Sequence, residues 1–220
     1  MPRRERRTVV AVEAIGPYAL VRVTRGSLDP GTPGQFFMLE APGRVLPRPF
    51  SLCLAPRGEL AFLVDPIGPG TRAIARVSPG EEMDIFGPLG RGFRLDVRKP
   101  VLVGGGIGVA PLPYLSEALE QPPAVLGFRT EHHAEAAVLV PNAEVVIDPV
   151  LVTDALPRDR EVLACGPEPM LAAIRTLCTR AQLACEAPMA CGYGACYGCV
   201  VEIDGKLERL CVEGPVLECS

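Results

Sequence analysis

The cysteines near the C-terminus constrain this chain more than any other feature. Cys191, Cys196 and Cys199 are spaced C-x4-C-x2-C, and Cys211 follows them. This is the plant-type spacing of thiolates that hold a [2Fe–2S] cluster. The glycines between the cysteines let backbone N–H groups approach the sulfur atoms and supply positive φ where the loop needs it. The tail is therefore predicted to hold an iron–sulfur site.

Two other interpretations of these cysteines stay open. Structural zinc usually takes two short C-x2-C-like pairs, whereas this tail has one. The other alternative is that these cysteines bind no metal and are buried free thiols. A disulfide framework is disfavoured, because the chain has an odd number of cysteines, nine. Disulfides are also typical of exported proteins, whereas the basic N-terminus here leads into β-like alternation instead of the apolar stretch of a signal peptide. We therefore expect a cytoplasmic protein.

The composition excludes several classes of partner. Hydrophobic residues make up 48% of the 220 positions, which allows a substantial core in one large domain or two small ones. A formal charge of −4 leaves no basic footprint for nucleic acid. No apolar run reaches the roughly 18 residues of a membrane span. We expect neither nucleic acid nor membrane as a partner, and we expect the basic run Met1–Arg7 to be a solvated tail.

The first ninety residues are typical of a β-structure. Short apolar, β-branched runs alternate with glycine and proline turns, and one helical stretch, Thr71–Val77, comes late. This pattern predicts a six-stranded antiparallel barrel. The expected strands are Thr8–Ile15, Tyr18–Thr24, Gln35–Glu40, Phe50–Ala55, Glu59–Val64 and Met83–Phe86.

From Lys99 the pattern changes to strands alternating with helices. Helices are expected near Leu112–Leu119 and Pro169–Gln182, which indicates a doubly wound parallel sheet. The expected strands are Pro100–Val103, Ala124–Phe128, Ala143–Ile147 and Glu161–Ala164. The predicted units are a barrel over 1–97, an α/β domain over 98–184 and a cluster-binding tail over 185–220, which is too short to form a core alone.

Two glycine-containing turns in the second unit are candidate nucleotide-binding elements. The run Gly104–Gly108 stands between a strand and a helix, where glycines let a pyrophosphate approach the backbone. The spacing is not the full G-x-G-x-x-G, and glycine turns also serve simple packing. Cys165-Gly166-Pro167 follows another apolar strand, at the sheet edge where ligands bind.

A third candidate element lies in the barrel. Arg48-Pro49-Phe50-Ser51 could place an arginine on a phosphate, and the backbone at Gly70-Thr71 could do the same. Taken alone, such a run is most often an ordinary strand start.

In this order, the elements resemble one family. The sequence is similar to the electron-transfer subunits of bacterial dihydroorotate dehydrogenase type B, within the ferredoxin-reductase superfamily. The resemblance covers nearly the whole chain, and the tail is its most specific part. The motifs that carry it are Arg48–Ser51, Gly70-Thr71, Gly87–Gly90, Gly104–Leu112, Cys165–Met170 and Cys191 through Cys211.

The resemblance implies three cofactors, FAD, NAD and a [2Fe–2S] cluster, and a set of residues for each. The flavin side comprises Arg48, Pro49, Phe50, Ser51, Leu63, Val64, Asp65, Gly70 and Thr71. The nicotinamide side comprises Gly104, Gly105, Gly106, Gly108, Cys165, Gly166 and Pro167. The cluster ligands are Cys191, Cys196, Cys199 and Cys211.

The resemblance also implies an oxidoreductase function in pyrimidine (UMP) biosynthesis. Electrons would pass from an FMN-containing subunit that oxidises dihydroorotate, through the cluster and the flavin, to NAD⁺. No catalytic acid or base is required, and a heterotetramer of two catalytic and two electron-transfer subunits is expected. The alternatives are an NAD(P)H reductase serving a hydrogenase- or ferredoxin-linked partner, and a non-enzymatic cluster or zinc module that senses redox state.

The chain departs from the family's pattern at two places. The family often carries a polar, glycine-containing loop after the strand ending near Ile147, but here 148–150 runs almost directly into 152–154. Arg91 stands where a small polar residue is common, close to the expected flavin.

Overall fold

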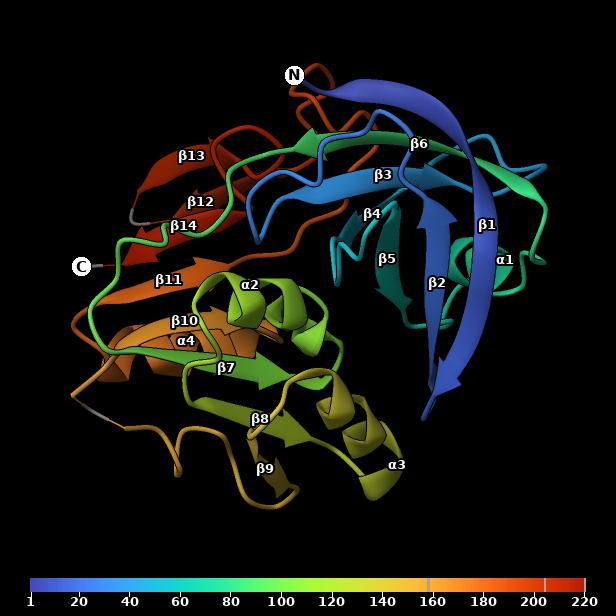
Figure 1. Ribbon diagram of the computed structural model, residues 1–220. Coiled ribbons are helices and arrows are strands. Elements are labelled where there is room, and N and C mark those ends of the chain that lie inside the picture. The colour runs from blue at the N-terminus through green and yellow to red at the C-terminus, as the bar shows by residue number, and fades with distance from the viewer. Residues whose placement is uncertain (158, 204, 220) are drawn as a thin grey trace.

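A long first strand organises the N-terminal half of the molecule. The computed structural model describes residues 1–157, 159–203 and 205–219, without the side chain of Cys219. Within residues 1–97, six antiparallel strands pair in the order β4-β3-β6-β1-β2-β5 and curl into a half-barrel (Figure 1). The strands are β1 (Arg3–Ile15), β2 (Tyr18–Thr24), β3 (Phe36–Glu40), β4 (Arg48–Ser51), β5 (Glu59–Val64) and β6 (Glu82–Leu89).

Strand β1 closes the curl because it pairs with different neighbours along its length. Its first half, Arg3–Thr8, pairs with β6, and its second half pairs with β2 after an irregularity between Val9 and Ala11. The basic N-terminus is therefore a strand and not a solvated tail. Its arginines form ion pairs across the sheet, with 2.9 Å from Arg4 to Glu40.

The barrel interior is filled by alternate side chains of these strands. Phe37 and Phe62 meet edge to face with ring centroids 5.6 Å apart, a favoured arrangement for aromatic pairs. Helix α1 (Pro69–Ala75) covers one end and buries Ile74 in the same core. The predicted helix is thus confirmed, two residues earlier than expected.

The second half is a doubly wound sheet. Its order is β14-β11-β10-β7-β8-β9, parallel except for β14, which runs antiparallel to β11. The strands are β7 (Pro100–Gly105), β8 (Ala124–Phe128), β9 (Glu144–Ile147), β10 (Glu161–Cys165), β11 (Ala181–Ala184) and β14 (Val216–Cys219). The helices are the 3₁₀ helices η1 (Gly106–Val109) and η2 (Glu135–Leu139), and α2 (Leu112–Ala118), α3 (Glu131–Ala134) and α4 (Glu168–Leu177).

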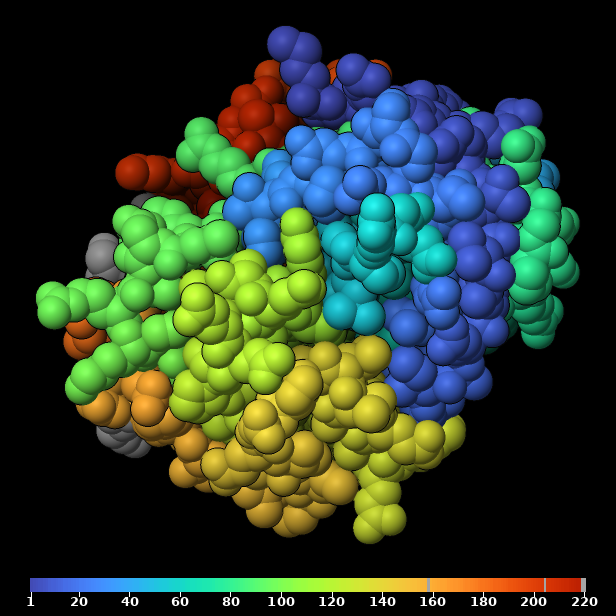
Figure 2. All heavy atoms as spheres, viewed as in Figure 1, coloured from blue at the N-terminus to red at the C-terminus, as the bar shows by residue number. Residues whose placement is uncertain are grey.

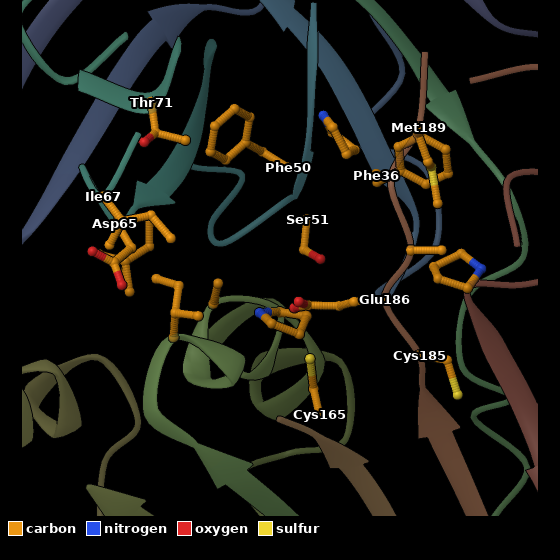
Figure 3. A pocket seen from close by; sticks show the side chains of 17 residues that line it. Phe36, Phe50, Ser51, Asp65, Ile67, Thr71, Cys165, Cys185, Glu186 and Met189 are labelled. Carbon is orange, nitrogen blue, oxygen red and sulfur yellow. The ribbon is translucent and has the colours of Figure 1, made fainter. Parts of the chain in front are cut away.

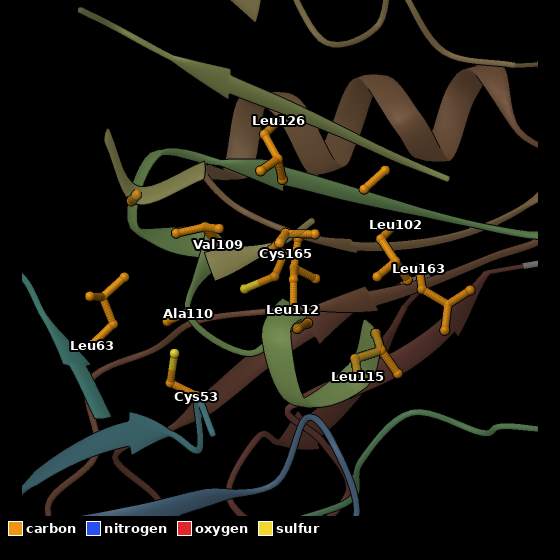
Figure 4. Close-up of a cluster of buried hydrophobic side chains, with 14 of the residues drawn as sticks. Cys53, Leu63, Leu102, Val109, Ala110, Leu112, Leu115, Leu126, Leu163 and Cys165 are labelled. Atoms are coloured by element: carbon orange, nitrogen blue, oxygen red, sulfur yellow. The ribbon is translucent and has the colours of Figure 1, made fainter. Parts of the chain in front are cut away.

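Strand alternation decides which helix covers which face of this sheet. Leu102 of β7 packs in one cluster with Leu112 and Leu115 of α2 (Figure 4). Its neighbours Val101 and Val103 point the other way and pack in the cluster that contains Leu171 and Ile174 of α4. Because successive side chains of a strand face opposite sides, one apolar strand supplies both cores.

The helix expected over Pro169–Gln182 is wrong at its C-terminal end. Helix α4 ends at Leu177, Cys178 is extended with φ −114° and ψ 133°, and the chain enters β11 at Ala181. All four residues of β11 are buried. A short strand buried on both faces has no alternation, so its periodicity does not separate it from a helix.

The tail is better ordered than its length suggests. It contains a hairpin of β12 (Val200–Ile203) and β13 (Lys206–Arg209), and it returns to the parallel sheet as β14. The barrel and the second half also touch directly, as the adjoining blue-cyan and green-yellow atoms show (Figure 2). The hydroxyl of Tyr114 in α2 donates to the carbonyl of Gly31 at 2.9 Å.

We expect Gly108→Ala to destabilise the protein by about 2 kcal/mol or more. A Cβ at Gly108 would lie 2.2 Å from the backbone carbonyl oxygen of Cys165, which cannot move without shifting β10. Gly68→Ala is the control, because nothing lies within 4 Å of its added Cβ and its φ is −119°. It should cost less than about 1 kcal/mol. Chemical denaturation measures both, and equal losses would contradict the packing argument.

Candidate functional site

The two predicted nucleotide-binding turns lie side by side at one edge of the parallel sheet. Strands β7 and β10 are adjacent and parallel, with Gly104 opposite Cys165. From β7 the chain builds outward to β8 and β9, and then returns to the other side of β7 as β10 and β11. The strand order therefore reverses between β7 and β10, and in open α/β sheets ligands bind at the carboxyl ends of the strands at such a point.

A cleft with about 250 Å³ of free volume lies above this edge, between the two sheets. The barrel contributes one wall, η1 and β10 contribute the floor, and the segment after β11 contributes the third wall (Figure 3). Of the predicted residues, the cleft is lined by Pro49, Phe50, Ser51, Leu63, Asp65, Thr71 and Cys165.

Arg48 stands beside the cleft and against Gly70. A Cβ at Gly70 would lie 2.9 Å from Nε of Arg48, so the guanidinium lies in close contact with this glycine. Nη1 of Arg48 donates to the carbonyls of Leu46 and Pro47 at 3.0 and 3.1 Å. The guanidinium is thereby held against Gly70, and a cation held beside a glycine backbone in this way fits a phosphate.

Val64 points away from the cleft. It is fully buried and packs in the barrel core, whereas its neighbours Leu63 and Asp65 line the cleft. Strand alternation accounts for this difference. Burial raises the pKa of Asp65, and the nearby His133 opposes that shift.

The glycines of the β7 turn divide into two kinds. Gly105 and Gly106 line a second cleft of about 340 Å³, together with Pro167. Gly104 lies below this surface, where a Cβ would be 2.8 Å from the side chains of Leu112 and Leu126. Gly108 is close to β10, as described above, and Gly166 packs on Met170. Gly105 lines the cleft but also packs closely, because a Cβ there would lie 2.7 Å from Sδ of Met170 and 2.8 Å from Cδ of Pro167. Of these glycines, only Gly106 has open space beside it.

The shortened segment after β9 forms the opposite wall of this second cleft. Asp148, Val150, Leu151, Val152 and Thr153 all line it. Arg91, in contrast, lies outside both clefts. Its N–H donates to the carbonyl of Gly214 at 2.5 Å, and its side chain lines a separate surface hollow near the β12–β13 hairpin.

The two clefts meet along the same strip of chain. Gly106 lines the second cleft and the next residue, Ile107, lines the first; Pro167 lines the second and Cys165 lines the first. An elongated ligand lying over this strip would reach both clefts. This geometry fits a dinucleotide whose phosphates cross the glycine turn.

The cysteine loop presents its backbone N–H groups to sulfur. Burial acts to raise the pKa of Cys191, but hydrogen bonds from the N–H groups of Tyr193, Cys196 and Ala195 outweigh it and lower the pKa to about 6. Positive φ at Gly192 and Gly194 gives the loop the conformation in which these groups converge. The loop therefore stabilises thiolate, the form that binds iron.

The four sulfur atoms are arranged as two pairs. Cys199 and Cys211 are both buried, with their sulfur atoms 3.2 Å apart. Burial, followed by the contact with Cys199, raises the pKa of Cys211 to about 12. The thiol of Cys196 makes a hydrogen bond with Cys191. Two pairs of thiolates fit the two irons of a [2Fe–2S] centre.

The cluster loop is attached directly to the first cleft. Met189 lines the cleft, and Cys191 is two residues further along the chain. A Cβ at Gly192 would lie 2.8 Å from Met38 of β3, so the loop backbone lies on the barrel surface. A cluster held by this loop would therefore sit beside whatever occupies the cleft.

Glu186 also belongs to this site, although no sequence motif pointed to it. Its side chain enters the first cleft between Ser51 and Cys165 (Figure 3). Desolvation by the cleft walls raises the pKa of Glu186, although the residue as a whole is exposed. Burial, followed by the charge of Glu186, also raises the pKa of Cys165. Glu186 follows the end of β11, so its position could have been recognised from the sequence only if β11 had been predicted.

Comparisons with known proteins agree with this site. Residues 186–220 match the iron-sulfur cluster binding domain of dihydroorotate dehydrogenase B. The chain is 35% identical to the "Dihydroorotate dehydrogenase B (NAD(+)), electron transfer subunit" of Geobacillus thermodenitrificans, over 97% of this chain and 96% of that protein. It is 32% identical to the protein of the same name from Clostridium perfringens, over 91% and 89%.

Solved structures share the fold. An NADH-dependent reduced ferredoxin-NADP oxidoreductase superposes with a TM-score of 0.83 at 24% identity, covering 96% of this chain and 87% of that one. Phthalate dioxygenase reductase superposes with a TM-score of 0.66 at 14% identity, covering 90% and 85%. Both confirm the predicted class of a six-stranded antiparallel barrel, here a half-barrel, followed by a doubly wound sheet. No helix in the described part of the chain could span a membrane.

We expect Cys191→Ser and Cys211→Ser each to lower bound iron from about two atoms per chain to a small fraction of that. Each substitution removes one thiolate from one of the two sulfur pairs. Cys178→Ser is the control, because Cys178 follows α4 outside the cysteine loop. Iron and acid-labile sulfide assays measure the effect. Full iron in both ligand variants, or stoichiometric zinc in the wild type, would refute the assignment.

Proposed function

Because this chain belongs to the family of dihydroorotate dehydrogenase B electron transfer subunits, we propose that it carries electrons from a dihydroorotate-oxidising catalytic subunit to NAD⁺ in pyrimidine biosynthesis. The observation that carries this proposal is the continuity of three sites. The cysteine loop adjoins the first cleft through Met189, and the first cleft joins the second along Gly106 and Ile107.

We assign FAD to the first cleft and NAD to the second. When bound, the [2Fe–2S] centre supplies single electrons and FAD exchanges them for the hydride that NAD⁺ accepts. The chain's residues position these groups. Arg48 and the backbone at Gly70 would hold the flavin's phosphates, and Pro49 through Ser51 would hold its ring. Gly105, Gly106 and Pro167 would support the dinucleotide, and the four cysteines would hold the cluster.

The cleft residues also control charge and water around the reacting groups. Burial raises the pKa values of Asp65, Cys165 and Glu186. A thiol kept protonated at Cys165 packs as a small polarizable group and is a poor nucleophile. No residue need act as an acid or base, and the chain's part is to bind, orient and exclude water.

The domain assignment follows from the same sites. We propose that residues 1–97 bind FAD, 98–184 bind NAD and 185–220 bind the cluster. The third unit is not independent in space, because β14 completes the sheet of the second. We place the complex in the cytoplasm, where reducing conditions keep thiols available to a cluster.

An anaerobic visible absorption spectrum tests the redox part of the proposal. The purified protein should show flavin and iron–sulfur bands, and both should bleach when NADH is added. Bands that persist after NADH would refute dinucleotide binding at the second cleft. A colourless protein that contains zinc would refute the electron-transfer function.

We further propose that the partner is an FMN-containing catalytic subunit, in a heterotetramer of two subunits of each kind, and that it docks over the cysteine loop. Electron transfer requires close approach to the cluster, and large apolar side chains are exposed there beside the charged Arg4, Glu40 and Asp84. Tyr193 and Tyr197 of the loop are 61% and 63% exposed, and Val45 and Leu46 nearby are 89% and 58% exposed. Val45 and Tyr193 line one groove with Cys191. Tyrosine is enriched at binding hot spots.

The double substitution Val45→Glu with Leu46→Glu should weaken binding of the catalytic subunit by at least about tenfold, because two charges would be buried at the interface. Reduction of the flavin by NADH should not change. Val138→Glu is the matched control, since Val138 is 73% exposed on η2 in the other half of the molecule. Calorimetric titration with the catalytic subunit measures the affinities. Unchanged affinity in the double variant would move the interface elsewhere.

A further inference from the structure

The wall of the second cleft after β9 combines exposed apolar groups with one free carboxylate. Val150 and Leu151 are 48% and 57% exposed, although they are large aliphatic residues, and both line the cleft. Such a surface fits a flat apolar group such as a nucleotide base. Asp148 precedes them by two residues and lines the same cleft.

The backbone of this wall is fixed by its own hydrogen bonds. The N–H of Asp148 donates to the carbonyl of Phe128 at 3.1 Å, and the N–H of Val150 donates to that of Ile147 at 3.0 Å. The carboxylate of Asp154 accepts from the N–H of Leu151 at 3.1 Å. Asp154 is thus committed to the turn, whereas the carboxylate of Asp148 makes no ion pair or side-chain hydrogen bond within the described residues.

Arg129 lies between this wall and the glycine turn. Phe128 pairs with Ile147, so the next residues, Arg129 and Asp148, emerge side by side from β8 and β9. Gly105 of the turn pairs with Gly127, two residues before Arg129. The order across the cleft is therefore the glycine turn, Arg129, Asp148 and the apolar surface. A dinucleotide that crosses the cleft with its phosphates over the glycine turn would bring these phosphates near Arg129 and the sugar of its adenosine near Asp148.

We propose that Asp148 makes the second cleft selective for a dinucleotide with a free 2′-hydroxyl on its adenosine, which is NAD(H), against one with a 2′-phosphate, which is NADP(H). A carboxylate accepts a hydrogen bond from the hydroxyl and repels the phosphate. Arg129 at the end of β8 would by itself favour the phosphate, and Asp148 beside it offsets that charge. This inference rests on the proposed function, because it assumes that the cleft binds a dinucleotide.

Binding of NADH and NADPH to the holoprotein tests the proposal, with adenosine 5′-monophosphate and adenosine 2′,5′-bisphosphate as competitors that need no electron transfer. The wild type should prefer NADH and the monophosphate. Asp148→Asn and Asp148→Ser should shift the NADH-to-NADPH affinity ratio toward NADPH by about 10- to 100-fold, the range expected for one hydrogen bond to a charged group. Glu144→Gln is the matched control, because Glu144 is exposed at the other end of β9.

The outcomes separate this inference from the function on which it rests. Absence of binding by both dinucleotides in the wild type would refute the assignment of the cleft. A wild type that binds the monophosphate and the bisphosphate equally would refute the role of Asp148, even if neither variant folds. An unchanged ratio in folded Asp148 variants would also refute it, and so would an equal shift in Glu144→Gln.

Discussion

The arrangement of the sites depends on a backbone contact between the end of the barrel and the tail. The N–H of Arg91 donates to the carbonyl of Gly214, and the N–H of Val216 donates to that of Arg91 at 3.4 Å. A Cβ at Gly90 would lie 2.6 Å from the Gly214 oxygen, so this approach is possible only because no side chain intervenes. The contact leads the chain into β14 on the parallel sheet. It fixes the cysteine loop, which precedes it, between the barrel and the first cleft.

This contact explains why a tail of 36 residues (185–220) can hold a cluster. Leu210, Cys199 and Cys211 are buried in the same cluster as Val101 and Val103 of the parallel sheet. The tail therefore shares the core of the second half and does not need one of its own. Packing against the core of the parallel sheet makes up for the small apolar area that a segment of this length could bury by itself.

The sequence predicted the features that local chemistry determines and missed those that depend on distant pairing. Cysteine spacing located the cluster loop, and glycine turns after apolar strands located the edge of the sheet. Strand β14 was missed because its partner, β11, is more than thirty residues away and was itself taken for the end of a helix. Glu186 was missed for the same reason. Arg91 was expected near the flavin, but the pairing of the tail with the barrel turns it to another surface.

Glycine motifs illustrate a further limit of the sequence. Gly104, Gly105, Gly106 and Gly108 look equivalent in the run Gly104–Gly108, yet only Gly105 and Gly106 line a cleft. Gly105 also packs against Pro167 and Met170. The other two let η1 approach β10 and α2 approach β7. Both kinds are needed for one site, because the cleft residues can support a phosphate only if the packing residues bring the turn against Cys165. Ligand binding and close packing both depend on the turn backbone lying close to its neighbours. Which of the two roles a given glycine has can be told only from the side chains around it.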